Sequence, residues 1–342
     1  MDKQLIVENI HVRATRDDFE VVGVFNPAVI RLGDETVMIA RVAESVVQNH
    51  RDHYLVPFVN GTGNIEMKSI PKQSAEYDYS DLRIIRNEKT SYLTSISHFR
   101  VARSTDGVTF DFNGPVRIFP ETIYEEYGIE DPRITCIDDV YYITYTAVSR
   151  HGINVGLMRT VDFERFERLG IIFHPDNKDV VIFPEKVKGR YFALHRPSLS
   201  AFGRLDIWTA ESSNLISWGN HKVMVEAVPK CSVTKRIGAG AVPFLTEKGW
   251  VVVYHGADAQ SRYYLTVMLL DKDDPNKVLA KSRRPLLEPT EPFERLGFMN
   301  DVVFTCGLVV DEEAIRIYYG VCDQSIACCT VSMDELWSNL EV

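Results

Sequence analysis

The chain has 342 residues, 45% of them hydrophobic and 25% charged, so it is globular and long enough for one large domain or two ordinary ones. Its formal net charge of −10 argues against nucleic acid or an anionic membrane as the main partner. No run approaches the roughly 20 apolar residues of a membrane span, and no apolar targeting segment follows the charged start. We therefore expect a cytoplasmic protein. Its six cysteines lack CxxC spacing, which favours reduced thiols and predicts no metal site.

Short runs rich in Val, Ile, Tyr and Phe, separated by Gly, Asp, Asn and Pro, predict an all-β fold. Five runs resemble one another, and each follows a polar turn: 35–41, 140–146, 190–196, 249–255 and 314–320. Helical patterning is confined to Met333–Leu340 near the C-terminus and, more weakly, to Glu121–Tyr127.

A second motif follows several of these runs. It reads Ala102–Gly107 and recurs as Met158–Phe163 and Ala210–Asn214, each time with an aromatic residue a few positions later. A weak repeat of roughly 50 residues with several strands per unit is typical of a propeller blade. Five units predict a five-bladed β-propeller as one domain over residues 1–342, and a two-sheet sandwich is the alternative. The long first interval predicts an insertion near Asp52–Tyr79.

Two acids precede a proline in the tetrapeptide Glu130-Asp131-Pro132-Arg133. Proline restricts the residue before it to an extended conformation, which suits a side chain held at the entrance of a strand. A carboxylate fixed near an apolar, aromatic-rich pocket has a raised pKa and can act as a general acid. The plainer interpretation is a turn carboxylate paired with Arg133.

Basic residues recur near the ends of the later apolar runs: Arg150, His195, Arg196, Lys235, Arg236 and His255. Each alone is better explained as a surface charge or a buried histidine. A propeller brings equivalent residues of different blades to one axis, so these side chains are expected to converge. Guanidinium groups bind phosphate bidentately and stay charged, so the convergence predicts a phosphate site. An acid beside such cations is what cleavage of a glycosidic bond by an anionic nucleophile requires.

Together these segments resemble glycoside hydrolase family 130, the inverting β-mannoside phosphorylases and related β-mannosidases. The matching stretches, in chain order, are 24–28, 39–44, 97–107, 130–135, 180–197, 236–256, 297–307 and 318–323. They run across nearly the whole chain. The amino-acid sequences of Tyr127–Thr135 and Lys178–Pro197 most resemble those of the β-1,2-mannobiose and oligomannan phosphorylases.

The resemblance implies a five-bladed propeller with Asp131 as the general acid. It also implies that phosphate is held by Arg150, Arg196, the Lys235-Arg236 pair and His255. The implied substrate contacts are Asn26, Arg41 and Asp323, and we place Glu130, Arg133 and His195 with them. One departure concerns the family's phosphate-binding lysine. Counted back from His255, the position of that lysine is occupied by Arg236 in this chain. A cation is therefore kept, with a different geometry.

We expect inorganic phosphate to attack the anomeric carbon of a terminal β-mannoside and to release α-mannose 1-phosphate. Phosphate is a co-substrate here, and no cofactor is expected. An inverting hydrolase needs a second carboxylate to activate water, such as Glu185 or Asp258. That β-mannosidase, a β-1,4-mannoside phosphorylase and a sugar-binding propeller without catalysis are the alternatives. The oligomeric state stays open, although enzymes of this size are often symmetric oligomers.

Overall fold

The computed structural model describes residues 1–48, 50–81, 83–198, 204–227 and 234–340. It confirms the all-β fold. The C-terminal helix is α2 (Met333–Asn339), and the Ser332 side chain caps it by accepting from the Glu335 amide. The segment Glu121–Tyr127 holds only the 3₁₀ turn η2 (Ile123–Glu125).

Two more short helical segments were not expected from the sequence: the 3₁₀ turn η1 (Asn9–His11) and the single-turn helix α1 (Pro292–Arg295). Across the described ranges, no helix has the length and apolar character needed to cross a membrane.

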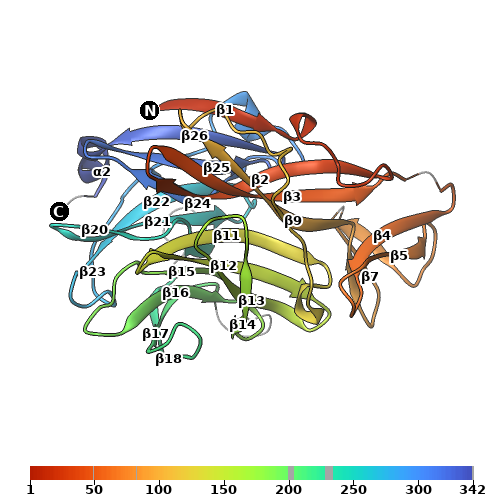
Figure 1. The fold of residues 1–342 in the computed structure, drawn as a ribbon, viewed down its shortest axis with the longest axis horizontal. Helices are drawn as coiled ribbons and strands as arrows, with labels where there is room; N and C mark the ends of the chain where they lie inside the picture. The colour runs from red at the N-terminus through yellow and green to blue at the C-terminus, as the bar shows by residue number, and fades with distance from the viewer. Residues whose placement is uncertain (49, 82, 199–203, 228–233, 341–342) are drawn as a thin grey trace.

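Within the described residues, the strands form five successive antiparallel groups (Figure 1). The first two groups are β2 (Phe19–Leu32), β3 (Glu35–Val46), β9 (Ser95–Ser104) and β10 (Arg117–Ile118), then β11 (Gly128–Ile137), β12 (Val140–Ser149), β13 (Gly152–Thr160) and β14 (Glu167–Phe173). The third and fourth are β15 (Asn177–Ile182), β16 (Tyr191–Pro197), β17 (Ile207–Ser212) and β18 (Trp218–Val225), then β19 (Thr234–Ala239), β20 (Phe244–Thr246), β21 (Gly249–Asp258), β22 (Tyr263–Leu270) and β23 (Val278–Lys281). The fifth is β24 (Val303–Val310), β25 (Ala314–Val321) and β26 (Ser325–Ser332), completed by the N-terminal strand β1 (Asp2–Glu8).

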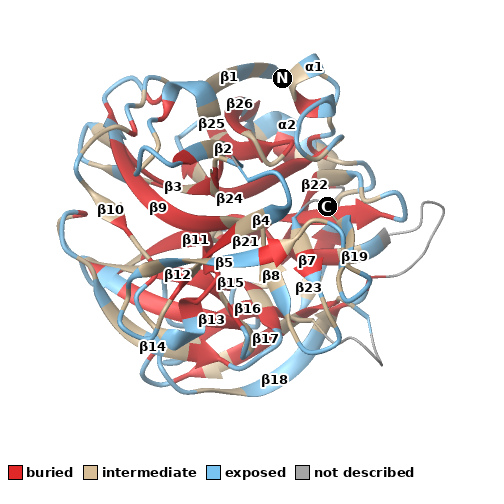
Figure 2. Cartoon of the chain, turned by 90° about the vertical axis from the view of Figure 1, so that its right-hand side faces the viewer, coloured by how far each residue is buried: buried red, intermediate tan, exposed pale blue. Residues whose placement is uncertain are grey.

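The first two groups belong to one sheet, because β11 and β9 are joined by a parallel pair between Gly128 and Ser97. The five runs singled out in the sequence all form strands, and each pairs directly with the first strand of its group: β3, β12, β16, β21 and β25. Buried residues follow these strands and their neighbours through the interior (Figure 2).

The second repeated motif forms the same turn after the third strand of three groups. The hydroxyl oxygens of Ser104, Thr160 and Ser212 each accept a hydrogen bond from the backbone amide three residues later, at 2.9, 3.0 and 3.0 Å. A Ser or Thr side chain that satisfies the backbone in this way ends a strand locally. The repeat read from the sequence therefore corresponds to a structural repeat.

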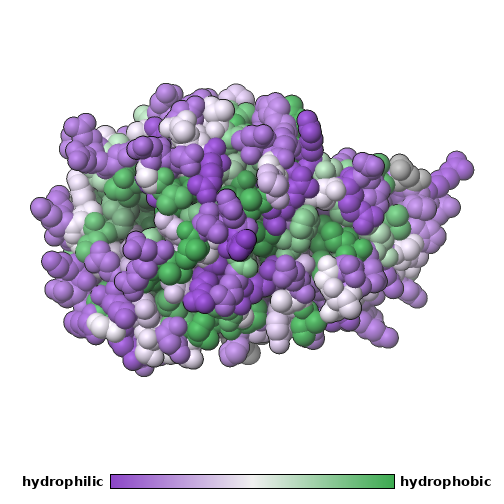
Figure 3. All heavy atoms as spheres, viewed as in Figure 1, coloured by the Kyte–Doolittle hydropathy of each residue, from purple (hydrophilic) through white to green (hydrophobic). Residues whose placement is uncertain are grey.

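An insertion interrupts the first group between β3 and β9. It contains the hairpin β4 (His53–Val59) and β5 (Ile65–Pro71), followed by the small sheet β6 (Asp78–Asp81), β7 (Ile84–Arg86) and β8 (Ser91–Leu93). A small core of its own includes Val56, Ile70 and Ile85. This protruding insertion, residues 53–93, projects on the right of Figure 1, and its tip is hydrophilic in Figure 3. It starts where the sequence predicted and extends further, to Leu93.

The first strand of every group carries a β-bulge. In three of them the bulge holds a residue with left-handed backbone geometry: Asn26, Asp131 and Asp179, with φ of 49°, 52° and 56°. Asn and Asp tolerate this region better than other non-glycine residues. The extended conformation predicted for Asp131 from Pro132 is therefore wrong, because the bulge decides the backbone there.

A buried ion pair links the second and third strands of the first group. Arg100 Nη2 donates to Glu44 Oε1 at 2.8 Å, and both side chains are buried. Removing one partner of such a pair leaves an uncompensated buried charge.

We expect Arg100→Ala to lower the free energy of unfolding by about 3 kcal/mol, because Glu44 loses its cation in the interior. Urea-induced unfolding would measure the change. The control is Arg159→Ala, which breaks the exposed pair with Glu167 and should change stability little. Equal losses in both variants would contradict the expectation.

Candidate functional site

A cavity of about 700 Å³ opens where the first strands of the groups meet, and the protruding insertion forms part of its wall. Its volume suits a small ligand of one or two sugar units. The polar side chains on its walls come from strands far apart in the sequence. Acids and cations occupy different parts of the cavity, and we describe the two parts in turn.

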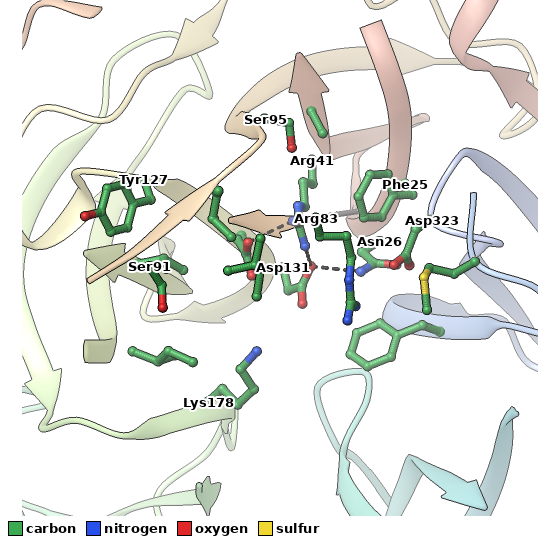
Figure 4. Close-up of a pocket in the computed structure, with 18 of the residues that line it drawn as sticks. Phe25, Asn26, Arg41, Arg83, Ser91, Ser95, Tyr127, Asp131, Lys178 and Asp323 are labelled. Carbon is green, nitrogen blue, oxygen red and sulfur yellow. Dashed lines mark hydrogen bonds and ion pairs between the residues drawn. The ribbon is translucent and has the colours of Figure 1, made fainter. Parts of the chain in front are cut away.

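The acidic part is centred on Asp131 (Figure 4). Its Oδ1 accepts from Asn26 Nδ2 at 2.8 Å and from Arg41 Nη1 at 3.2 Å. The same guanidinium binds Glu130 Oε1 through Nη2 at 2.8 Å and Ser97 Oγ through Nε at 2.9 Å. Asp131 is thus held from two sides by groups on β2 and β3.

The two carboxyl groups of this part titrate differently. Burial opposes ionisation of Asp131, but the charges of Arg41, Arg133 and Lys178 keep its pKa below the usual value. The expected rise in the pKa of Asp131 is therefore not found in the free protein. Burial instead raises the pKa of Asp323 to about 6, helped by the charge of Asp131 and opposed by Arg41.

The cationic part surrounds a buried carboxylate, Asp179. Arg133 Nη2 lies 3.2 Å from its Oδ1, and Arg196 Nη1 and His255 Nε2 lie 2.8 and 3.4 Å from its Oδ2. The charge of Arg196, the hydrogen bond from His255 and the charge of Arg133 together outweigh burial and hold the pKa of Asp179 well below its usual range. Burial lowers the pKa of His255, so its imidazole is neutral at physiological pH. Gly238 lies against this cluster, since a Cβ there would be 2.2 Å from Asp179 Oδ2.

Two arginine donors in the cationic part, Arg196 Nε and Arg236 Nε, are buried and have no hydrogen-bond partner among the described residues. Buried polar groups in folded proteins nearly always have a partner. Within the described residues, Arg236 donates a 3.3 Å bond to Ser261 Oγ, and its guanidinium lies 5.1 Å from the Tyr263 ring centre. An anion with several acceptor oxygens would satisfy these groups.

Most of the predicted site residues line this one cavity: Asn26, Arg41, Glu130, Asp131, Arg150, Arg196, Arg236, His255 and Asp323. Arg150 lies at the rim with its side chain 62% exposed, and its guanidinium is occupied by Glu126. Arg133 lies beneath the cavity, where it donates to the backbone oxygen of Asp131 at 3.0 Å and so does not neutralise the Asp131 carboxylate directly.

Besides Arg133, two further predicted residues lie outside the cavity lining, so the expected convergence of all the basic residues is corrected for His195 and Lys235. His195 sits on the central strand β16 and faces the other way, within 3.0 Å of Asn177 Nδ2 and 3.1 Å of His221 Nδ1. Burial lowers the pKa of His195 to about 3, so it is a neutral structural histidine. Lys235 is exposed, and its neighbour Arg236 is the cation that reaches the cavity.

Sequence reasoning missed Lys178, Asp179 and Arg83, which also line the cavity. Lys178 points into it in Figure 4. Asn177-Lys178-Asp179 opens the first strand of the third group, so comparison with Asn26-Pro27 and Asp131-Pro132 in other first strands could have revealed it. Arg83 comes from the insertion, where no repeat exists to guide a prediction. In the described part of the chain, no group of three or more His, Cys, Asp or Glu side chains could hold a metal ion.

The chain is similar to known proteins over most of its length. The sequence model of glycoside hydrolase family 130, described as beta-1,4-mannooligosaccharide phosphorylase, matches residues 77–341. A beta-1,2-mannobiose phosphorylase of Listeria innocua is 41% identical, over 98% of this chain and 96% of that protein. A 1,2-beta-oligomannan phosphorylase of a Thermoanaerobacter species is 37% identical, over 70% of this chain and 80% of that protein.

A solved structure is similar throughout. The Listeria innocua beta-1,2-mannobiose phosphorylase in complex with beta-1,2-mannobiose superposes with a TM-score of 0.95 at 40% identity. The match covers 100% of this chain and 99% of that one.

Asp323 provides a pH test of the acidic part. It holds its proton more tightly in the folded than in the unfolded chain, so its contribution to stability is fully present below about pH 4 and is lost as the pH rises through 6. We expect Asp323→Asn to remove this component. The stability of the parent relative to the variant should fall between pH 4 and 6 and stay level above pH 7, as measured by urea unfolding. A constant difference across that range would refute the raised pKa.

Proposed function

Because the chain belongs to glycoside hydrolase family 130, we propose that it is an inverting phosphorylase of terminal β-mannosides that releases α-mannose 1-phosphate. The observation that carries this function is one cavity in which a positioned acid, Asp131, faces buried cations with unsatisfied donors. The proposed substrate is β-1,2-mannobiose or a short β-1,2-mannooligosaccharide. This linkage is supported by the β-1,2-specific names of relatives that are 41% and 37% identical.

Phosphate binds in the cationic part in this proposal, held by Lys178, Arg196, Arg236 and His255. The guanidinium groups and the lysine reduce the repulsion between phosphate and the carboxylates of the cavity. Arg150 is left out of the cluster, because its exposed side chain lies at the rim, paired with Glu126, whereas the other cations are grouped around Asp179 or line the same end of the cavity. A phosphate oxygen attacks the anomeric carbon in line, the glycosidic C–O bond breaks, and the configuration inverts.

Asp131 supplies the proton for the leaving oxygen. In the free protein its pKa is low, so the carboxyl group must gain its proton in the complex. A phosphate dianion would favour this in two ways. Its negative charge raises the pKa of a nearby carboxyl group, and by pairing with Lys178 it weakens the stabilisation that this lysine gives to the ionised Asp131. Phosphate binding and protonation of Asp131 are then coupled, so bound phosphate favours the protonated form of Asp131 that the reaction requires.

Hydrolysis is less well supported. The candidate bases for water were Glu185 and Asp258, but Glu185 is exposed and Asp258 binds Arg262 at 2.7 Å, and neither lines the cavity. Asp179 does line it, but Arg196, Arg133 and a hydrogen bond from His255 hold its pKa low, which makes it a weak base. A nucleophile that is already anionic needs no such base.

The five groups of strands are the five blades of a propeller in this proposal. Support comes from the repeated order of the strands, from the turn shared by three groups and from the contacts of the first strands β2, β11, β15 and β24 with one another. Strand β1 closes the last blade. A cytoplasmic location, expected from the sequence, fits a reaction that consumes inorganic phosphate.

The function is tested with β-1,2-mannobiose in the presence and absence of inorganic phosphate. We expect mannose 1-phosphate only when phosphate is present, and no product from Asp131→Asn, because the acid is then missing. Anion-exchange chromatography separates mannose 1-phosphate from free mannose. Free mannose formed at the same rate without phosphate would indicate a hydrolase instead.

Two variants test whether Lys178, which the sequence did not predict, or Arg150, which it did, binds phosphate. We expect Lys178→Ala to raise the KM for phosphate roughly tenfold, since a charge-assisted hydrogen bond contributes on the order of 1.5 kcal/mol. Arg150→Ala should leave this KM nearly unchanged, because Glu126 engages the arginine. Initial rates at varied phosphate measure both values. The opposite ranking would place Arg150 in the phosphate site.

A further inference from the structure

The protruding insertion contributes a charged side chain to the mouth of the cavity. Arg83 lies between β6 and β7, and its guanidinium extends into the cavity in Figure 4. Asp81 Oδ1 and Oδ2 accept from its Nε and Nη2, both at 3.0 Å, which fixes its orientation. Among the described residues no hydrogen bond occupies Nη1. Arg83 therefore points into the cavity, and its Nη1 can donate a hydrogen bond to a ligand.

Arg83 reaches towards the opposite wall. The charge of Asp323, which belongs to the fifth group, acts on its guanidinium. On that wall Phe298 follows α1 and lines the cavity while 41% of its surface stays exposed. A large aromatic residue left exposed beside a polar cavity offers an apolar face to a ligand. A guanidinium and an aromatic ring thus flank the mouth.

The geometry of in-line displacement assigns a ligand to this place. The attacking phosphate and the leaving oxygen lie on opposite sides of the anomeric carbon. The cations around Asp179 are buried, so phosphate binds at the floor and the leaving sugar points to the mouth. The mouth is where the insertion lies, in front of β11 and β21 in Figure 2.

We propose that Arg83 and Phe298 form the binding site of the leaving sugar, so that the insertion determines which sugar the enzyme accepts there. Arg83 donates to the hydroxyls of that sugar, and Phe298 covers its apolar face. This inference rests on the proposed phosphorolysis and adds the residues that recognise the acceptor. Neither residue touches the phosphate or the mannosyl unit that is transferred.

The test runs the reaction in the synthetic direction, with α-mannose 1-phosphate as donor and mannose as acceptor. We expect Arg83→Ala and Phe298→Ala each to raise the KM for mannose about tenfold. The KM for α-mannose 1-phosphate should change less than twofold, because the donor binds deeper. Arg83→Lys should recover part of the loss, since it keeps the charge without the fork geometry.

Matched controls come from the same segments. Arg86→Ala removes an arginine of β7 that does not line the cavity, and Leu296→Ala removes an exposed apolar side chain beside Phe298. Both should retain parental values. An equal rise in both KM values for Arg83→Ala, or no rise in either, would overturn the proposal. A parent protein that makes no disaccharide would instead count against the proposed phosphorolysis itself.

Discussion

The site depends on one backbone constraint, the bulge in the first strand of each group. In a regular strand, side chains alternate between two faces, and here both faces are packed against neighbouring groups. A bulge with left-handed geometry at Asn26, Asp131 and Asp179 interrupts that alternation and turns a polar side chain towards the shared cavity. Residue types that accept positive φ are also the types that carry the chemistry. The same local geometry is repeated in three of the five groups, at Asn26, Asp131 and Asp179.

Repetition also explains what could be predicted from the sequence. The five runs and the recurring turn revealed the strand groups, and the proline after Asp131 marked the acid. The cationic part was only partly predicted, because runs of basic residues do not show which neighbour faces inward: Arg236 reaches the cavity and Lys235 does not. His195 illustrates the same difficulty, since alternation along β16 sends it to the far side of Arg196. Arg83 lies in a segment outside the repeat, where only the three-dimensional structure places it.

Charge is separated within the cavity rather than cancelled. Arg41 faces two carboxylates at one end, whereas Asp179 faces Arg133, Arg196 and a neutral imidazole at the other. Within the described part of the chain, the charged groups at each end form ion pairs with one another and not with groups at the opposite end. A ligand lying between the two ends would meet guanidinium groups on one side and carboxylates on the other.

The N-terminal strand has a consequence for how the chain is made. Strand β1 pairs with β26, so that Asp2 lies opposite Thr330. During synthesis β1 emerges more than 300 residues before β26, so its partner does not yet exist. Closing so long a loop is slow, and the last sheet keeps an open edge until then. Strand β1 is therefore made early and ordered late, and the open edge is where an incomplete chain is most exposed to wrong pairing.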